Sequence, residues 1–323
     1  MKRPIFALAM ALCAVKLAFA QAAPIADHHQ HVFSPAAAAM LSTAQRSFNA
    51  LPAGDVVALL DAAKIQRGVL LSVAYMYGSP SRTVEDEYAK VRAENDWTGA
   101  QAARYPSRLI AFCGVNPLKD YALDEIARCA ASPQLRRGLK LHFGNSDVQL
   151  ERPEHLARMR EIFGAANRHR MAIAVHMRAS ISKQRPYGAA QANLFLEQLM
   201  PLAIDIPVQV AHMAGSGPGY DDAPAEAAMA ALAEAAERRD PRTQQLWFDV
   251  ASSADAAISE AHAALLAKRI RQVGTDRILY GSDAAVADNL RPRAAWEAFR
   301  RLPLTDAEFE RIAANVAPYF LER

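Results

Sequence analysis

Two histidines separated by one residue form the first pattern with chemical meaning. His29 and His31 lie in the stretch 25–33, which we expect to be the end of a β-strand. Residues two apart in a strand project to the same face, so both imidazoles and Asp27 should point together, while His28 faces the helices. Two neutral imidazoles on one face suit a metal ion, although the same pattern also occurs in polar pockets without metal.

Five further residues whose side chains could bind a metal ion or take part in catalysis stand at the ends of other apolar runs. They are Lys140, His142, His176, His212 and Asp283. If these runs are parallel strands, their carboxyl ends meet at one edge, and the side chains converge on one pocket. Three imidazoles with a carboxylate are a ligand set suited to Zn²⁺, with Mn²⁺ or Fe²⁺ as alternatives.

Short apolar runs alternate with helical stretches eight times along the chain. We expect strands at 25–33, 68–74, 109–115, 138–143, 171–177, 208–213, 246–251 and 277–281. We expect helices at 55–64, 83–104, 121–131, 153–170, 189–199, 223–239, 254–273, 292–302 and 306–321. Eight such units predict an α/β fold of the (β/α)8 barrel type. A doubly wound open sheet would need an early glycine-rich phosphate turn, and the glycine run 215–219 follows a late strand.

Residues 1–20 resemble a signal peptide. Lys2 and Arg3 precede the apolar segment 5–15, and Ala18 and Ala20 form a small-x-small cleavage site. The apolar segment is too short to span a bilayer, so no stable membrane insertion is expected after cleavage. We therefore expect residues 21–323 to form a single barrel with a C-terminal helix, exported to the periplasm or secreted.

The charge balance bears on the partners. Outside the first twenty residues the 323-residue chain holds 34 basic and 34 acidic residues. This neutrality argues against nucleic acid as a partner, and a small-molecule substrate is expected. A homo-oligomer is left open. Two cysteines remain, Cys113 and Cys129; they could form a disulfide in an oxidising compartment, but two buried thiols are the preferred interpretation.

Taken together, these motifs resemble the amidohydrolase superfamily. Within it, the chain is similar to the amidohydrolase-related branch that includes aminocarboxymuconate semialdehyde decarboxylase and pyrone dicarboxylate lactonase. The matching stretches are Asp27–His31, Gly138–His142, 174–176, 210–212, 280–283 and 311–317. The resemblance implies a (β/α)8 barrel with one divalent metal ion.

The resemblance also implies roles for individual residues. His29, His31, His176 and Asp283 match the metal ligands, and His212 matches the histidine that orients or activates a water. Lys140 matches a lysine that bridges two metals in other relatives, and we interpret it here as a substrate-binding residue.

Members of this branch hydrolyse C–O or C–N bonds or decarboxylate an acid. We therefore expect an exported metal-dependent hydrolase, in which a metal-bound hydroxide attacks a lactone, ester or amide of a small carboxylated substrate. His212 and Asp283 would move protons. Two alternatives stay open: a metal-dependent non-oxidative decarboxylase, and an exported metal-binding protein without turnover.

The remaining candidates bind substrate. Lys140 and Arg178 would favour an anionic substrate, and His142 and Tyr75 would line the pocket. Arg178 could equally be a surface residue of a long loop, and His142 could lie just behind the metal ligands. Two capping boxes are also predicted, Thr83 with Asp86 and Thr305 with Glu308.

Overall fold

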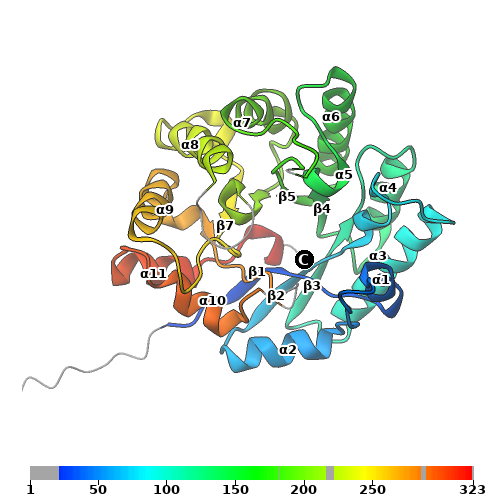
Figure 1. Ribbon diagram of the computed structural model, residues 1–323, viewed down its shortest axis with the longest axis horizontal. Coiled ribbons are helices and arrows are strands. Elements are labelled where there is room, and N and C mark those ends of the chain that lie inside the picture. Colours follow the sequence, from blue (N-terminus) through cyan, green and yellow to red (C-terminus); the bar gives the residue numbers. More distant parts are fainter. Residues whose placement is uncertain (1–21, 181, 216–221, 285–288, 322–323) are drawn as a thin grey trace, which may run out of the picture.

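Eight parallel strands form one sheet in which every strand pairs with the next along the chain. The computed structural model describes residues 22–180, 182–215, 222–284 and 289–321. The strands form an inner ring and the helices surround it (Figure 1). The predicted (β/α)8 barrel is confirmed.

The strands are short and nearly all of their residues are buried. They are β1 (Ala26–Gln30), β2 (Arg67–Leu71), β3 (Leu109–Gly114), β4 (Gly138–His142), β5 (Ala172–His176), β6 (Val208–Val210), β7 (Leu246–Asp249) and β8 (Ile278–Leu279). All eight strands end one to three residues earlier than the sequence predicts, so His212 and Asp283 follow β6 and β8 instead of standing within them.

Helices follow the strands and cover the outside of the ring. They are α1 (Pro35–Leu41), α2 (Ala53–Ala62), α3 (Glu87–Ala103), α4 (Ala122–Ala131), α5 (Phe143–Ser146), α6 (Pro153–Arg168), α7 (Ala189–Leu194), α8 (Ala223–Glu237), α9 (Glu260–Val273), α10 (Pro292–Phe299) and α11 (Asp306–Ala314). A π-helical turn, Phe195–Leu199, continues α7 over the rest of the helix predicted there.

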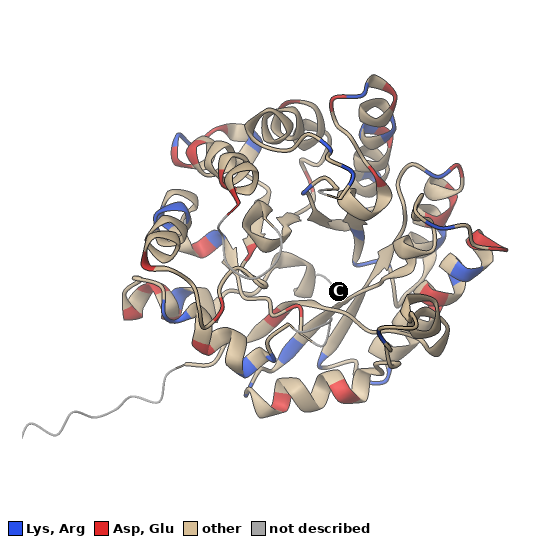
Figure 2. Ribbon diagram, viewed as in Figure 1, with Lys and Arg blue, Asp and Glu red and all other residues tan. Residues whose placement is uncertain are grey.

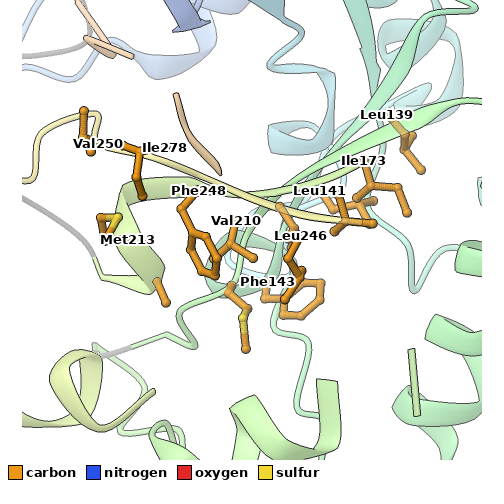
Figure 3. Packing of buried hydrophobic residues seen from close by; sticks show 14 of the residues in the cluster. Leu139, Leu141, Phe143, Ile173, Val210, Met213, Leu246, Phe248, Val250 and Ile278 are labelled. Atoms are coloured by element: carbon orange, nitrogen blue, oxygen red, sulfur yellow. The ribbon is translucent and has the colours of Figure 1, made fainter. Parts of the chain in front are cut away.

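Alternation along each strand separates the site from the core. In β4, Leu139 and Leu141 belong to the large outer cluster that packs against the helices, as do Val210 of β6 and Phe248 of β7 (Figure 3). Lys140 lies between the two leucines and therefore faces the barrel interior. A strand buried on both faces can carry a charged residue only toward a polar interior, which is the environment of Lys140.

The barrel closes between β1 and β8. His28 donates its backbone N–H to Tyr280 O at 2.9 Å, and Asp283 donates its backbone N–H to His29 O at 2.8 Å. The strands come so close that a Cβ on Gly281 would lie 2.8 Å from the Cβ of His29, so only glycine fits there without a shift. This seam brings the end of β1 next to Asp283.

The expected orientation of His28 is wrong. The register of β1 is irregular between Asp27 and Gln30, which breaks the simple alternation of the strand. His28 packs against Tyr319, and its Nδ1 donates to Tyr280 O at 2.9 Å. Asp27 is also displaced from the expected face, because its carboxylate accepts hydrogen bonds from the side chain and backbone of Ser282.

The C-terminal segment fills the amino-terminal end of the barrel. A 3-10 helix, Pro318–Phe320, carries Tyr319, which contacts Phe112 of β3 and Gln209 of β6. Side chains of these two strands meet only inside the ring, and Figure 1 shows the last described residues, in red, within it. The inner apolar cluster around Tyr319 is thus the floor below the site.

Helix boundaries test the local sequence signals. The capping box of Thr305 and Glu308 is confirmed at the start of α11. The box predicted for Thr83 and Asp86 is wrong, because Asp86 adopts a left-handed backbone and makes no side-chain cap bond. Ser259 caps α9, which begins six residues later than predicted, and α11 ends at Ala314, ahead of the 3-10 helix of the floor.

The preferred interpretation of the cysteines is also wrong. Cys113 of β3 and Cys129 of α4 form a disulfide, with their Cα atoms 6.2 Å apart. The bond ties a strand to the helix that follows it.

Charged residues of both signs are spread over the outer helices (Figure 2). Some form ion pairs between helices, such as Arg271 of α9 with Glu308 of α11. No helix in the described part of the chain is long and apolar enough to cross a membrane. The predicted signal peptide lies outside the described residues, as does most of the glycine run 215–219.

Candidate metal centre

One cavity of about 160 Å³ opens at the carboxyl ends of the strands. Eight of the nine predicted site residues line it: His29, His31, Tyr75, Lys140, His142, His176, His212 and Asp283. The ninth, Arg178, does not. The other lining residues are Phe33, Val73, Met76, Ser252 and Asn289, which the sequence did not single out.

Three of the imidazoles are held in the same way. Each Nδ1 faces an oxygen that can only accept, so Nδ1 carries the hydrogen and Nε2 keeps its lone pair. These contacts are His29 with Asp249 Oδ2 at 3.0 Å, His31 with Leu71 O at 2.6 Å, and His212 with Ala251 O at 2.7 Å. Fixing one ring nitrogen leaves the other ready to bind a metal ion.

The Nε2 atoms of His29 and His31 lie near the carboxylate of Asp283. Its Oδ1 lies 3.5 Å from His31 Nε2 and 3.8 Å from His29 Nε2. Ligand atoms of His29, His212 and Asp283 all lie within 4.8 Å of one another. Four ligands at 2.0–2.1 Å from one tetrahedral ion are about 3.4 Å apart, so small movements suffice to hold a metal.

The carboxylate of Asp283 gives a second, independent reason to expect a cation at this place. Its Oδ1 is buried and accepts no hydrogen bond among the described residues, whereas Oδ2 accepts one from Asn289 Nδ2 at 2.9 Å. A buried carboxylate oxygen without a partner is costly unless a cation binds it. The donor set therefore fits a divalent metal ion.

Lys140 lies at the edge of this cluster. Its Nζ is 3.3 Å from His29 Nε2, and burial lowers the pKa of the amine to about 8. Among the described residues, Lys140 is the only lysine that lines the cavity. It places a basic amine beside the imidazole of His29.

His142 differs from the three imidazoles described above. Its Nδ1 accepts a hydrogen bond from the backbone N–H of Asn145 at 3.1 Å, so in the neutral ring Nε2 carries the hydrogen. Burial, followed by the nearby charge of Lys140, holds the pKa of His142 well below its usual value. His142 thus presents a donor rather than a lone pair to the cavity.

His176 lies between two of these rings. It stacks on His142 with ring centroids 3.9 Å apart, and its centroid is 5.0 Å from that of His212. Burial, followed by the effect of His142, lowers the pKa of His176 well below its usual value. A neutral imidazole at this place can serve as a ligand or as a neighbour of the ligands.

Several residues at the rim of the cavity have a left-handed backbone, as do some residues elsewhere in the chain. His212 (φ 55°), Met213 (φ 49°) and Ala214 (φ 61°) adopt left-handed conformations in succession, and Asp283 (φ 52°) does so too. Such non-glycine residues cost roughly 1–3 kcal/mol each and cluster at functional sites. Asp249 offsets part of this strain, because its Oδ1 accepts the backbone N–H of His212 at 2.9 Å.

Arg178 and Tyr75 occupy different places. Arg178 is 4% exposed and forms an ion pair with Asp222 at 2.7 Å, with its guanidinium 5.9 Å from the ring centre of Tyr187. Tyr75 lines the cavity beside His142, and burial raises the pKa of its hydroxyl. The phenol therefore stays protonated and can donate.

Asp249 is the main residue that the sequence analysis missed. It ends β7 after an apolar run, as the predicted site residues end theirs, and this position was the available signal. Burial raises the pKa of its carboxyl, but the interaction with His29 and the hydrogen bond from its ring outweigh this, so the pKa lies below its usual value. Asp249 is therefore ionised and contacts the side of His29 that faces away from Asp283. It belongs to none of the sequence motifs described above.

Comparison with known proteins places the chain in a family. The amidohydrolase family model matches residues 26–317, so the chain belongs to this family of metal-dependent enzymes. No curated protein matches the chain in sequence.

Solved structures share the fold. The chain is 14% identical to 5-carboxyvanillate decarboxylase from Sphingomonas paucimobilis, with a TM-score of 0.61 over 90% of this chain and 96% of that one. It is 17% identical to a protein assigned as a 2-pyrone-4,6-dicarboxylic acid hydrolase from Pseudomonas putida, with a TM-score of 0.59 over 91% and 95% of the two chains.

A third structure contains a metal. It is a dihydroxybenzoic acid decarboxylase from Polaromonas with bound manganese, 14% identical, with a TM-score of 0.58 over 90% of this chain and 95% of that one. At these identities the likeness establishes the fold alone.

Proposed function

We propose that the protein is an exported metal-dependent hydrolase that opens a lactone, ester or amide of a small carboxylated molecule. The observation that carries the proposal is the Oδ1 of Asp283, which accepts no hydrogen bond among the described residues and lies beside the Nε2 atoms of His29 and His31. His29, His31, His176 and Asp283 would hold one divalent ion. Zn²⁺ suits this set, and Mn²⁺ or Fe²⁺ are alternatives.

Such an ion lowers the pKa of a bound water toward neutrality and polarises a carbonyl oxygen. The chain's own residues then orient substrate and move protons. His212 is neutral, because burial lowers its pKa, and its bond to Ala251 O leaves Nε2 open to accept a proton. It can return that proton to the leaving group.

The hydrogen-bond donors that line the cavity support the proposal of a carboxylated substrate. Lys140 offers an ammonium, and His142 offers its Nε2–H from the neighbouring position of β4. Tyr75 adds a protonated hydroxyl. Charge-assisted hydrogen bonds from such donors would bind a carboxylate beside the metal ligands.

Non-oxidative decarboxylation is the second candidate. The same donors that bind a carboxylate beside the ligands could hold it as the reacting group. Two of the structural relatives described above are named decarboxylases, and the third is assigned as a hydrolase. The two reactions differ in product, since hydrolysis yields a new acid and decarboxylation yields carbon dioxide.

A metal-replete screen would test both candidates. Lactones, esters, amides and aromatic carboxylic acids would be incubated with wild type and with His176→Ala, and both acid and carbon dioxide would be measured. Ring-opened acid from wild type alone would support the hydrolase, and carbon dioxide would support the decarboxylase. No turnover with tight, reversible zinc binding would favour a metal-binding protein without catalysis.

Export is supported by the disulfide. Cys113 and Cys129 are bonded, and such bonds persist in oxidising compartments. The mass of the protein recovered from the periplasm or medium would test this. A mature chain that begins at Gln21 is the expected result, and a full-length chain retained in the cytoplasm would contradict it.

A further inference from the structure

A line of buried hydrogen bonds connects the floor of the barrel to the metal centre. The hydroxyl of Tyr319 donates to Gln209 Oε1 at 2.6 Å, and Gln209 Nε2 donates to Asp249 Oδ2 at 2.6 Å. The same Oδ2 accepts the hydrogen of His29 Nδ1 at 3.0 Å. All four side chains are at most 1% exposed, so water does not substitute for any of these contacts.

The direction of each bond is set by chemistry. Burial raises the pKa of Tyr319 well above its usual value, so its hydroxyl keeps the proton and donates. Gln209 Nε2 also donates to the backbone O of His28 at 3.1 Å. With two acceptors on one side and a donor on the other, only one orientation of the amide satisfies all three.

Asp249 holds two site residues in place, His29 and His212. Its Oδ2 fixes the ring of His29, and its Oδ1 holds the strained backbone of His212. A shift of the carboxylate would therefore move both imidazoles. Groups behind the ligands of metal sites commonly set affinity in this way.

We propose that Tyr319 and Gln209 are positioning residues of the metal centre: they hold Asp249 so that His29 presents its Nε2 to the ion. The inference rests on the metal site of the proposed function. It assigns the C-terminal segment a role beyond filling the barrel, and it locates that role in one hydroxyl group.

Tyr319→Phe tests the proposal, because it keeps the ring and removes only the hydroxyl. Tyr280→Phe is a matched control: Tyr280 is equally buried, and its hydroxyl donates to Pro292 O at 2.5 Å, outside the line. The dissociation constant for Zn²⁺ would be measured by competition with a chelator, together with the melting temperature. Gln209→Met serves as a second, stronger variant.

We expect Zn²⁺ binding to weaken by about 3–10-fold in Tyr319→Phe and by about 10–100-fold in Gln209→Met, the range known for residues behind metal ligands. Tyr280→Phe should lower the melting temperature as much as Tyr319→Phe and leave the affinity unchanged. Equal affinities of the two tyrosine variants would overturn the proposal. If wild type itself binds neither Zn²⁺ nor Mn²⁺, the proposed metal centre is wrong, and the positioning role of Tyr319 and Gln209 is wrong as well.

Discussion

The two ends of the barrel are built from the same strands but differ in chemistry. At the carboxyl end, imidazoles, Lys140 and Asp283 face a cavity, and the backbone is strained at His212 and Asp283. At the amino end, Tyr319 and Phe112 fill the interior among small apolar side chains. The difference shows that the titratable side chains of the site line the carboxyl end, where the cavity opens, whereas apolar packing fills the amino end.

The largest expected effect is at the carboxyl end. Asp283→Asn should lower kcat/KM by roughly 10³-fold, about 4 kcal/mol of transition-state stabilisation, because a metal ligand is lost. The metal-free variant should melt no lower than wild type, since the buried charge without a partner is removed. Metal analysis, turnover and thermal melting check this. If Asp283→Asn keeps both metal and activity, Asp283 is not a metal ligand.

His176 and His212 sharpen the comparison within that end. His176→Ala should lose the metal, as expected of a ligand. His212→Ala should keep it and lose about 10²–10⁴-fold in kcat, as expected of a proton-transfer group. Elemental analysis of both variants beside steady-state kinetics decides. Loss of metal in His212→Ala alone would make His212 the ligand and His176 the proton-transfer group. The grouping of His29, His212 and Asp283 within 4.8 Å is the reason to test this outcome.

The amino end should respond in stability instead. Asn315 donates to Thr275 O at 2.7 Å and to Ile278 O at 2.6 Å, at the start of β8. Asn315→Ala should lower the free energy of unfolding by about 2 kcal/mol, because two carbonyls lose their donor. Zn²⁺ affinity should not change, since neither side-chain hydrogen bond of Asn315 involves Asp249 or Gln209. Chemical denaturation and metal titration measure the two quantities, and weakened Zn²⁺ binding would blur the division between the ends.

The smallest expected effect is a pH dependence. Burial lowers the pKa of Lys140 to about 8, so the amine is charged below that pH and neutral above it. If the ammonium binds a substrate carboxylate, KM should rise by up to about tenfold per pH unit above 8. Lys140→Met should show a raised KM without this inflection. An inflection that persists in Lys140→Met belongs to another group.

The fold was predictable because eight apolar runs alternate with helical stretches, and most of the cavity was predictable from period-two alternation at the strand ends. Lys140 and His142 stand two apart at the end of one strand, and eight such units converge on one rim. The same rule failed for His28, because an irregular register in β1 interrupts the alternation. It could not place Arg178, which lies in a loop, where no period constrains the direction of a side chain.

Other features depend on contacts between distant segments. Cys113 and Cys129 are paired because β3 and α4 lie side by side, which no spacing reveals. Asp249 gains its importance from His29, 220 residues earlier in the chain. Thr83 and Asp86 have the residues of a capping box, but the left-handed backbone of Asp86 prevents the bond. Local patterns give element types, whereas these partners require the folded barrel.

The floor of the barrel also determines the order of events in folding. Ala317 donates its backbone N–H to His28 Nε2 at 3.2 Å, which joins residues 289 positions apart in the sequence. Contacts with such separation form late, because closing a long loop is entropically unfavourable and every strand must be present first. The ribosome therefore completes all eight strands before the segment that supports His29 has been made. During synthesis the chain would pass through a barrel with an open floor, and His29 would reach its final position only once this segment had docked.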